Sequence, residues 1–217
     1  MGSEMCIRDR TYITYEVYIA PGLIAMIQLF NGMQSSLSMV YDREMGSMKT
    51  MLVSPIPRWF LLTSKLLAGV FVSILQVYAF LFIASFWDIK PPIFGYLSLL
   101  PALIVSGLML GALGMFLSSA IKQLANFAGV MNFVIFPMFF ASSALYPLWK
   151  IEETSEWLYV VCKFHPFTYA VDTIRYSLYA QVNLENSVGI ITCTIIFLTF
   201  SIIGYDPARR FIQKKGR

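Results

Sequence analysis

The sequence predicts an all-α fold, a polytopic bundle of membrane-spanning helices. Hydrophobic residues make up 58% of the 217 residues and charged residues only 13%, whereas a soluble domain is roughly half apolar and about a quarter charged. The apolar residues lie in five uncharged stretches of at least 20 residues each. A helix of about 20 apolar residues crosses a bilayer, and a helix satisfies its own backbone hydrogen bonds there. Composition therefore excludes disorder and disfavours a soluble enzyme.

Each uncharged stretch predicts one spanning helix. The five expected spans cover residues 17–40, 62–87, 94–120, 123–147 and 187–206. Residues 11–217 are expected to form one domain. Residues 1–10, MGSEMCIRDR, resemble no other part of the chain. We set them aside as a non-native or disordered start, with an ordinary short N-terminal tail as the alternative.

Lysine and arginine in the loops predict the orientation, because cytoplasmic loops are enriched in both. The 41–65 loop, the Lys122 link and a basic tail with five positive charges are expected in the cytoplasm, and the 148–185 segment outside. Five spans would then place the N-terminus outside, although no export signal precedes Glu16. This mismatch suggests that a first span is missing. The positive charges are spread over loops, so we expect no nucleic-acid partner.

Motifs for enzymatic chemistry are absent from the sequence. No G-x-x-x-x-G-K-[ST] phosphate-binding loop occurs, and His165 is the single histidine, so we expect no catalytic residues, no metal site and no cofactor on this chain. No charged residue lies deep in an expected span, whereas proton-coupled and ion-coupled carriers usually have one. The energy for transport would then come from a partner.

Polar residues of the first expected span share one side of the helix. They fall within an arc of about 120° at 100° per residue, and they are Gln28, Asn31, Gln34, Ser35 and Ser38. Such a stripe should face protein or water rather than lipid. One interpretation is hydrogen bonding between helices, and the other is the lining of a translocation path.

Small residues mark one face of the third expected span. Gly107, Gly111 and Gly114 follow each other at intervals of four and three residues, and the first two form a GxxxG pair. This spacing predicts close helix packing, either within the chain or between chains.

The segment between the first two spans predicts a short cytoplasmic helix over residues 42–53. Met45, Met48 and Leu52 recur at helical spacing, and Asp42 can cap the start. Pro55 and Pro57 would end this helix and lead into the next one. Its methionine face could dock in a groove of a partner protein or lie on lipid.

The 148–185 segment is long for a loop and predicts two external helices. IEETSEWLYVVCKF can form an amphipathic helix, and a second helix can begin after Pro166. We expect these helices to cap or re-enter the outer face of the bundle.

Four stretches of this sequence resemble the type-2 ATP-binding-cassette (ABC) exporter permeases. REMGSMKTMLVSPIPRWFLLTSKLL resembles the cytoplasmic coupling segment of that family, and SSALYPL, HPFTYAVDTIR and YDPARRF are similar to its later landmarks. Within that family, the sequence most resembles the drug-export and lipo-oligosaccharide-export permeases of bacteria. One departure is His165-Pro166, where the family commonly has Asn-Pro, and we expect His165 to be part of a structural turn.

The resemblance implies six spans per subunit, of which this chain would lack the first. It also implies a second permease subunit, a location in the bacterial inner membrane with the C-terminus in the cytoplasm, and a separate ATPase subunit that binds ATP and Mg²⁺. The residues that would couple the permease to the ATPase are Asp42, Arg43, Glu44, Met45, Gly46, Met48, Leu52, Pro55, Pro57 and Arg58.

The sequence therefore predicts the membrane subunit of an ATP-driven exporter for a drug, a lipid or a glycan-like substrate. The alternatives are a self-contained secondary carrier and a membrane scaffold without an ATPase partner. Co-purification of a nucleotide-binding subunit would distinguish the exporter from both.

Overall fold

The structure is a computed structural model that describes residues 5–7, 11–13, 15–46, 58–87, 92–121, 124–148, 151, 155–179 and 184–204. The described elements are β1 (Met5–Ile7), β2 (Thr11–Ile13), α1 (Tyr15–Glu44), α3 (Arg58–Ala84), the 3-10 helix η1 (Ser85–Trp87), α4 (Ile93–Ala120), α5 (Leu124–Phe140), α7 (Glu156–Phe164), α8 (Pro166–Leu178) and α9 (Leu184–Gly204).

The described chain starts with a small antiparallel hairpin. Strands β1 and β2 pair with Cys6 opposite Tyr12. Sequence reasoning set residues 1–10 aside and did not expect a strand there. The other elements that the structure describes are helices.

The predicted polytopic helix bundle is confirmed. Four helical segments are long and apolar enough to cross a membrane: Val17–Asp42, Phe60–Ala84, Phe94–Ala120 and Asn186–Gly204. They correspond to the first, second, third and fifth expected spans.

The fourth expected span, 123–147, is a shorter helix than predicted. Helix α5 has 17 residues and ends at Phe140, which corresponds to about 25 Å at 1.5 Å per residue. Serine hydroxyls bond to the backbone where α5 stops: Ser142 Oγ donates to the Phe139 carbonyl at 2.8 Å and accepts from the Ala144 amide at 3.3 Å. Such local bonds compete with helix continuation. The sequence predicted a helix up to residue 147 because 141–147 carries no charge, and this part of the prediction is wrong.

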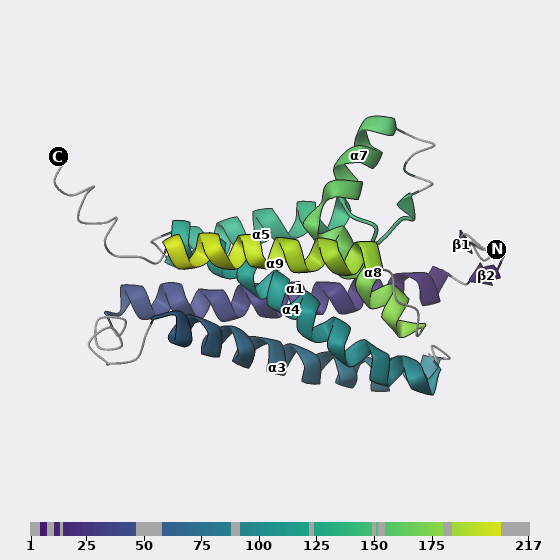
Figure 1. The fold of residues 1–217 in the computed structure, drawn as a ribbon, viewed down its shortest axis with the longest axis horizontal. Coiled ribbons are helices and arrows are strands. Elements are labelled where there is room, and N and C mark those ends of the chain that lie inside the picture. Colours follow the sequence, from purple (N-terminus) through teal and green to yellow (C-terminus); the bar gives the residue numbers. More distant parts are fainter. Residues whose placement is uncertain are drawn as a thin grey trace.

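Helix α4 lies at the centre of the bundle. It contacts α1, α3, α8 and α9 and runs obliquely across α1 in Figure 1. In the most apolar 18-residue stretch of α4, 67% is buried, compared with 28% in that of α3 and 17% in that of α9. Of these three helices, α3 and α9 therefore leave the most apolar surface available to lipid.

Glycines bring α1 and α4 into close contact. A Cβ atom added to Gly32 would lie 3.0 Å from the Cα atom of Gly111. A Cβ atom added to Gly114 would lie 2.6 Å from Ser36 Oγ, and one added to Gly107 would lie 3.3 Å from the Val70 side chain of α3. The three predicted packing glycines thus make these contacts within the chain.

The described helix ends that adjoin the segments predicted to be cytoplasmic lie near one end of the bundle (Figure 1). Figure 1 shows the end of α1, the start of α3 and the end of α9 at its left side. Asp42 of α1 forms an ion pair with Lys65 of α3 there, and Gly204 of α9 packs against Ser119 of α4. We call this the inner end. Helices α7 and α8 lie at the opposite, outer end.

The two predicted external helices are present as α7 and α8. Helix α8 is packed into the main core through Phe167, Val171 and Ile174, which are fully buried. Helix α7 projects away from the bundle in Figure 1, and Trp157 and Phe164 are exposed on it. Only α8 therefore helps to hold the spanning helices together.

We expect Gly32→Ala to destabilise the protein by about 1–3 kcal/mol, because the added methyl group meets the α4 backbone, which cannot rotate away. The matched control is Gly129→Ala in α5, where a Cβ atom would find no atom within 4 Å. Thermal unfolding in one detergent compares the two variants. Equal melting temperatures for both variants would contradict the assigned contact.

Candidate functional site

The predicted polar stripe of α1 runs from buried to exposed positions. Gln28 is buried, Asn31 and Ser35 are half-buried, and Gln34 and Ser38 are exposed. The order follows the helical angle, so one edge of the stripe faces the bundle interior and the other faces outward. The five residues therefore do not share one environment.

Gln28 joins α1 to α4 by hydrogen bonds. Its Nε2 atom donates to the Leu103 carbonyl at 2.8 Å, and Ser106 Oγ donates to its Oε1 atom at 2.5 Å. Both sides of the amide are thus satisfied inside the bundle, as a buried polar group requires. Gln28 has the geometry of a packing residue.

Asn31 and Ser35 lie at the contact between α1 and α3. Asn31 Nδ2 donates to Gln76 Oε1 of α3 at 2.7 Å and to the Ile27 carbonyl at 2.8 Å. Ser35 Oγ donates to the Lys65 carbonyl at 3.4 Å. Exposed Gln76 extends the polar edge of α1 onto α3.

Gln34 and Ser38 form the outward edge of the stripe. Ser38 Oγ donates to the Ser35 carbonyl at 2.7 Å, one turn back along its own helix. A hydrocarbon solvent offers no partner to an exposed amide such as that of Gln34, so this edge is suited to water or to another polypeptide.

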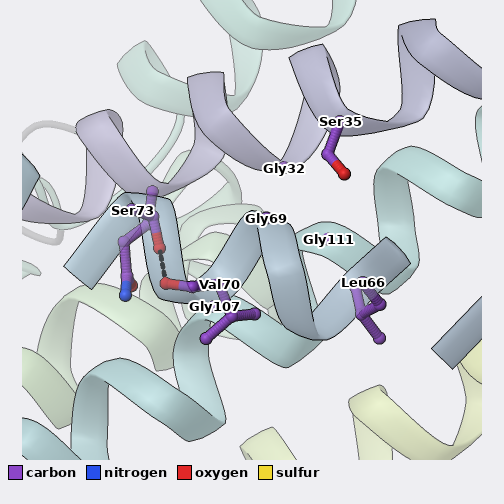
Figure 2. A pocket seen from close by; sticks show the side chains of 9 residues that line it. Gly32, Ser35, Leu66, Gly69, Val70, Ser73, Gly107 and Gly111 are labelled. Atoms are coloured by element: carbon purple, nitrogen blue, oxygen red, sulfur yellow. Dashed lines mark hydrogen bonds between the residues drawn. The ribbon is translucent and has the colours of Figure 1, made fainter. Parts of the chain in front are cut away.

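A small pocket lies where α1, α3 and α4 meet (Figure 2). Its lining comprises Gln28, Gly32, Ser35, Leu66, Gly69, Val70, Ser73, Gly107 and Gly111. The cavity volume is about 10 Å³, roughly what a single water molecule requires and far below the roughly 300–1,000 Å³ of typical ligand pockets. This pocket is therefore a packing defect between small residues rather than a substrate chamber.

The expected coupling helix does not start at Asp42. Residues 42–44 are the last turn of α1, and Gly46 has φ of +78° just beyond it. A positive φ at such a position is a common helix terminator, which explains why α1 continues past the expected end of the span and then stops. The prediction that Asp42 caps a separate helix is wrong, because its carboxylate pairs with Lys65 instead.

The other predicted coupling residues divide into two groups. Arg43 and Glu44 belong to α1, Met45 and Gly46 follow it, and Arg58 begins α3. Glu44 and Met45 are exposed at the inner end. The remaining four, Met48, Leu52, Pro55 and Pro57, lie outside the described residues.

Sequence reasoning missed a polar cluster at the outer end. Asp172 and Arg175 of α8 form an ion pair at 3.0 Å, with side chains only 17% and 14% exposed. Ser143 Oγ donates to Asp172 Oδ1 at 2.9 Å, and Arg175 Nη2 donates to the Ser143 carbonyl at 2.9 Å. We call these residues, together with Tyr18, the outer polar cluster.

Tyr18 connects the outer polar cluster to α1. Its hydroxyl donates to the Ser143 carbonyl at 3.0 Å, and the Arg175 guanidinium lies 4.2 Å from the centre of its ring. Residues from α1, from the turn after α5 and from α8 thus meet at one point. The i, i+3 spacing of Asp172 and Arg175 was a visible signal, but nothing in the sequence indicated Ser143 or Tyr18.

Burial controls the electrostatics of the outer polar cluster. It raises the pKa of the Asp172 carboxyl, and the Arg175 charge and the Ser143 hydrogen bond oppose that rise. Arg175 Nε is also buried and has no hydrogen-bond partner. Burying the two charges costs free energy, and their mutual attraction offsets this cost only while both are present.

His165 occupies the turn between α7 and α8. Its Nδ1 atom accepts from the Phe167 amide at 3.3 Å, as an N-cap residue does, and burial lowers its pKa. A neutral imidazole is suited to this acceptor role. The predicted structural turn is present.

Across the residues that the structure describes, no three His, Cys, Asp or Glu side chains gather in a way that could hold a metal ion. Two separate arrangements remain as functional candidates: the outward polar edge of α1 and the inner end between α1 and α3.

The fold and these arrangements are those of a polytopic helical membrane protein. The sequence profile of the ABC-2 type transporter family matches residues 6–179. The chain therefore belongs to the ABC-2 type transporter family, as its resemblance to type-2 ABC permeases predicted.

Two relatives illustrate the similarity. The protein named transport permease ycf38 of Pyropia yezoensis is 31% identical over 178 residues, which cover 78% of this chain and 58% of the relative. The Escherichia coli K12 protein named multidrug ABC transporter permease YbhR is 29% identical over 178 residues, covering 80% of this chain and 47% of the relative. The chain thus spans about half the length of these curated relatives.

We expect Arg175→Met to cost about 3–5 kcal/mol of stability at neutral pH, because it leaves a carboxylate buried without its cation. Without that cation the pKa of Asp172 rises further. A carboxyl with a raised folded-state pKa stabilises the fold below its unfolded-state pKa, and this contribution is lost as the pH rises through the folded-state pKa. The variant should therefore be most stable in acid.

Unfolding in detergent across a pH series measures this dependence. The control is the double variant Asp172→Asn, Arg175→Met, which lacks the carboxyl and should lose the slope. A single variant whose stability is independent of pH between acid and neutral conditions would refute the assignment.

Proposed function

We propose that the chain is the transmembrane permease subunit of an ATP-driven ABC exporter. The family match over residues 6–179 carries this proposal. The bundle of helices that are long enough to cross a membrane supports it, as do the permease names of the relatives. ATP and Mg²⁺ would bind to a separate ATPase subunit. The substrate would be a drug, a lipid or a glycan-like molecule.

The inner end is the proposed docking surface for the ATPase. Residues 42–58 join α1 to α3 there, and the exposed Glu44 and Met45 begin this connection. A soft apolar side chain beside charged ones suits a groove in a soluble partner. Movement of the ATPase would then reach α1 and α3 through their adjoining ends.

The outward polar edge of α1 is the proposed half of a translocation path. Gln34 and Ser38 lie on it, and α5 also exposes Asn132. Exposed polar side chains within spanning helices favour contact with a second permease subunit and with water between the two. Either an identical or a related chain could supply the other half.

The proposed location is the bacterial inner membrane, with the C-terminus in the cytoplasm. The basic residues of the tail support this orientation, since cytoplasmic segments are rich in lysine and arginine; they are Arg209, Arg210, Lys214, Lys215 and Arg217. The inner end of the bundle would then face the ATPase.

Co-purification tests the proposed function. We expect the tagged permease, solubilised from native membranes in mild detergent, to bring down a protein with a phosphate-loop ATPase sequence and ATPase activity. Mass spectrometry identifies the partner, and an unrelated tagged membrane protein serves as the control. Recovery of the permease in good yield without any ATPase would favour the self-contained carrier or the scaffold.

We also expect a cysteine at Gln34 to react with a membrane-impermeant maleimide when the protein is assembled in membranes. The path model places water beside this position. The matched control is Phe71→Cys on the exposed apolar face of α3, which should stay unreactive in lipid. Both are made in a background without Cys6, Cys162 and Cys193. Equal protection of both cysteines would contradict a water-lined edge.

A further inference from the structure

The inner end of the bundle has a small apolar core of its own. Met39 of α1, Leu62 and Leu66 of α3, and Met115 of α4 are buried together and form a cluster separate from the main core. Leu198 of α9 packs against this cluster. We call the four buried residues the inner-end cluster. It joins three spanning helices close to the end of α1 and the start of α3.

An ion pair closes this region on the side of that connection. Lys65 Nζ of α3 donates to Asp42 Oδ2 of α1, and the two side chains are 28% and 21% exposed. Asp42 lies two residues before the end of α1 at Glu44. Lys65 lies in the second turn of α3, which begins at Arg58. The pair therefore bridges the two helices that residues 47–57 connect.

Close backbone packing continues the contact toward the bundle centre. Ser35 Oγ reaches the Lys65 carbonyl at 3.4 Å, and a Cβ atom on Gly69 would lie 2.8 Å from Ser35 Oγ. Leu66 fills the space beside Gly111 of α4. Between residues 35 and 42 of α1, each turn thus has a partner on α3.

From this geometry we infer that the Asp42–Lys65 ion pair is a positioning device, which makes the inner ends of α1 and α3 move as one body with the inner-end cluster. Without it, a force on the connecting segment could separate the two helix ends instead of displacing both. This role in transmission depends on the proposed function, whereas the restraint between α1 and α3 belongs to this chain alone.

The positioning role can be distinguished from a contribution to overall stability, because the two predict different effects of removing one charge. A partly exposed ion pair adds little to stability, so Asp42→Asn should leave the melting temperature almost unchanged. A charge pair can still select one relative position of two helices, because it favours one geometry over neighbouring ones. The spread of positions is therefore the informative measurement.

Spin labels on Tyr41 of α1 and Leu67 of α3 can report that spread, since both side chains are exposed. The full-length permease is labelled in a background without its native cysteines, and pulsed electron resonance gives the distance distribution in nanodiscs. We expect a single narrow peak in the parent protein. Asp42→Asn and Lys65→Gln should each lose this narrow peak, and the charge swap Asp42→Lys, Lys65→Asp should restore it.

The matched control is Ser64→Ala, which changes an exposed side chain next to Lys65 and should keep the narrow peak. An unchanged peak in both single variants would overturn the inference. A charge swap that remains as broad as the single variants would also overturn it, because attraction between opposite charges would then not be the cause.

The transmission step is tested in the complex with the co-purifying ATPase. ATP with vanadate should leave the Tyr41–Leu67 distance of the parent protein unchanged and shift it in Asp42→Asn. A shift in the parent protein would overturn one-body movement. If the parent protein binds no ATPase while the nanodisc results hold, the restraint between the helices stands and the proposed function fails.

Discussion

The close contact between α1 and α4 is the constraint on which the other features depend. It requires that Gly32 of one helix lies against Gly111 of the other, since any larger residue would push the two backbones apart. This approach brings Gln28 within reach of Leu103 and Ser106, so its buried amide is satisfied. It also orients α1 so that the opposite edge of its polar stripe faces outward. The packing of small residues thus determines which polar side chains form hydrogen bonds between helices and which remain exposed on the surface of the bundle.

Contacts to charged groups tie both ends of α1 to the rest of the bundle, while its middle is held by glycine packing and by the hydrogen bonds of Gln28 and Asn31. At the outer end Tyr18 joins Ser143 and Arg175, and at the inner end Asp42 joins Lys65. The charged residues of α1 itself lie at its two ends, Glu16 at one and residues 42–44 at the other, and residues 17–41 contain none. This distribution follows from the high cost of a charge inside the bilayer. It also makes α1 the helix that connects the proposed ATPase side to the outer face.

The sequence predicted the helical elements well where hydrophobicity and length decide the outcome. Four of the five expected spans are present as long apolar helices, and the second external helix begins at Pro166 as expected, whereas α7 begins at Glu156, inside the stretch 151–164 that was predicted for the first. It failed where local hydrogen bonds override composition. Ser142 bonds to the backbone just after α5 ends, within a stretch that carries no charge. Gly46 ends α1 two residues after Glu44, later than the charge of Asp42 suggested.

The sequence alone was sufficient to establish a membrane-spanning helical bundle, the family resemblance and the position of the small-residue face. The bundle and the small-residue face follow from composition and periodicity, whereas the resemblance depends on four particular stretches of sequence. The partners of individual polar side chains depended on the tertiary structure. The pairing of Asp42 with Lys65, and the meeting of Tyr18, Ser143, Asp172 and Arg175, join residues that are far apart in the chain. Their positions result from how the helices cross, and spacing along one helix carries no information about that geometry.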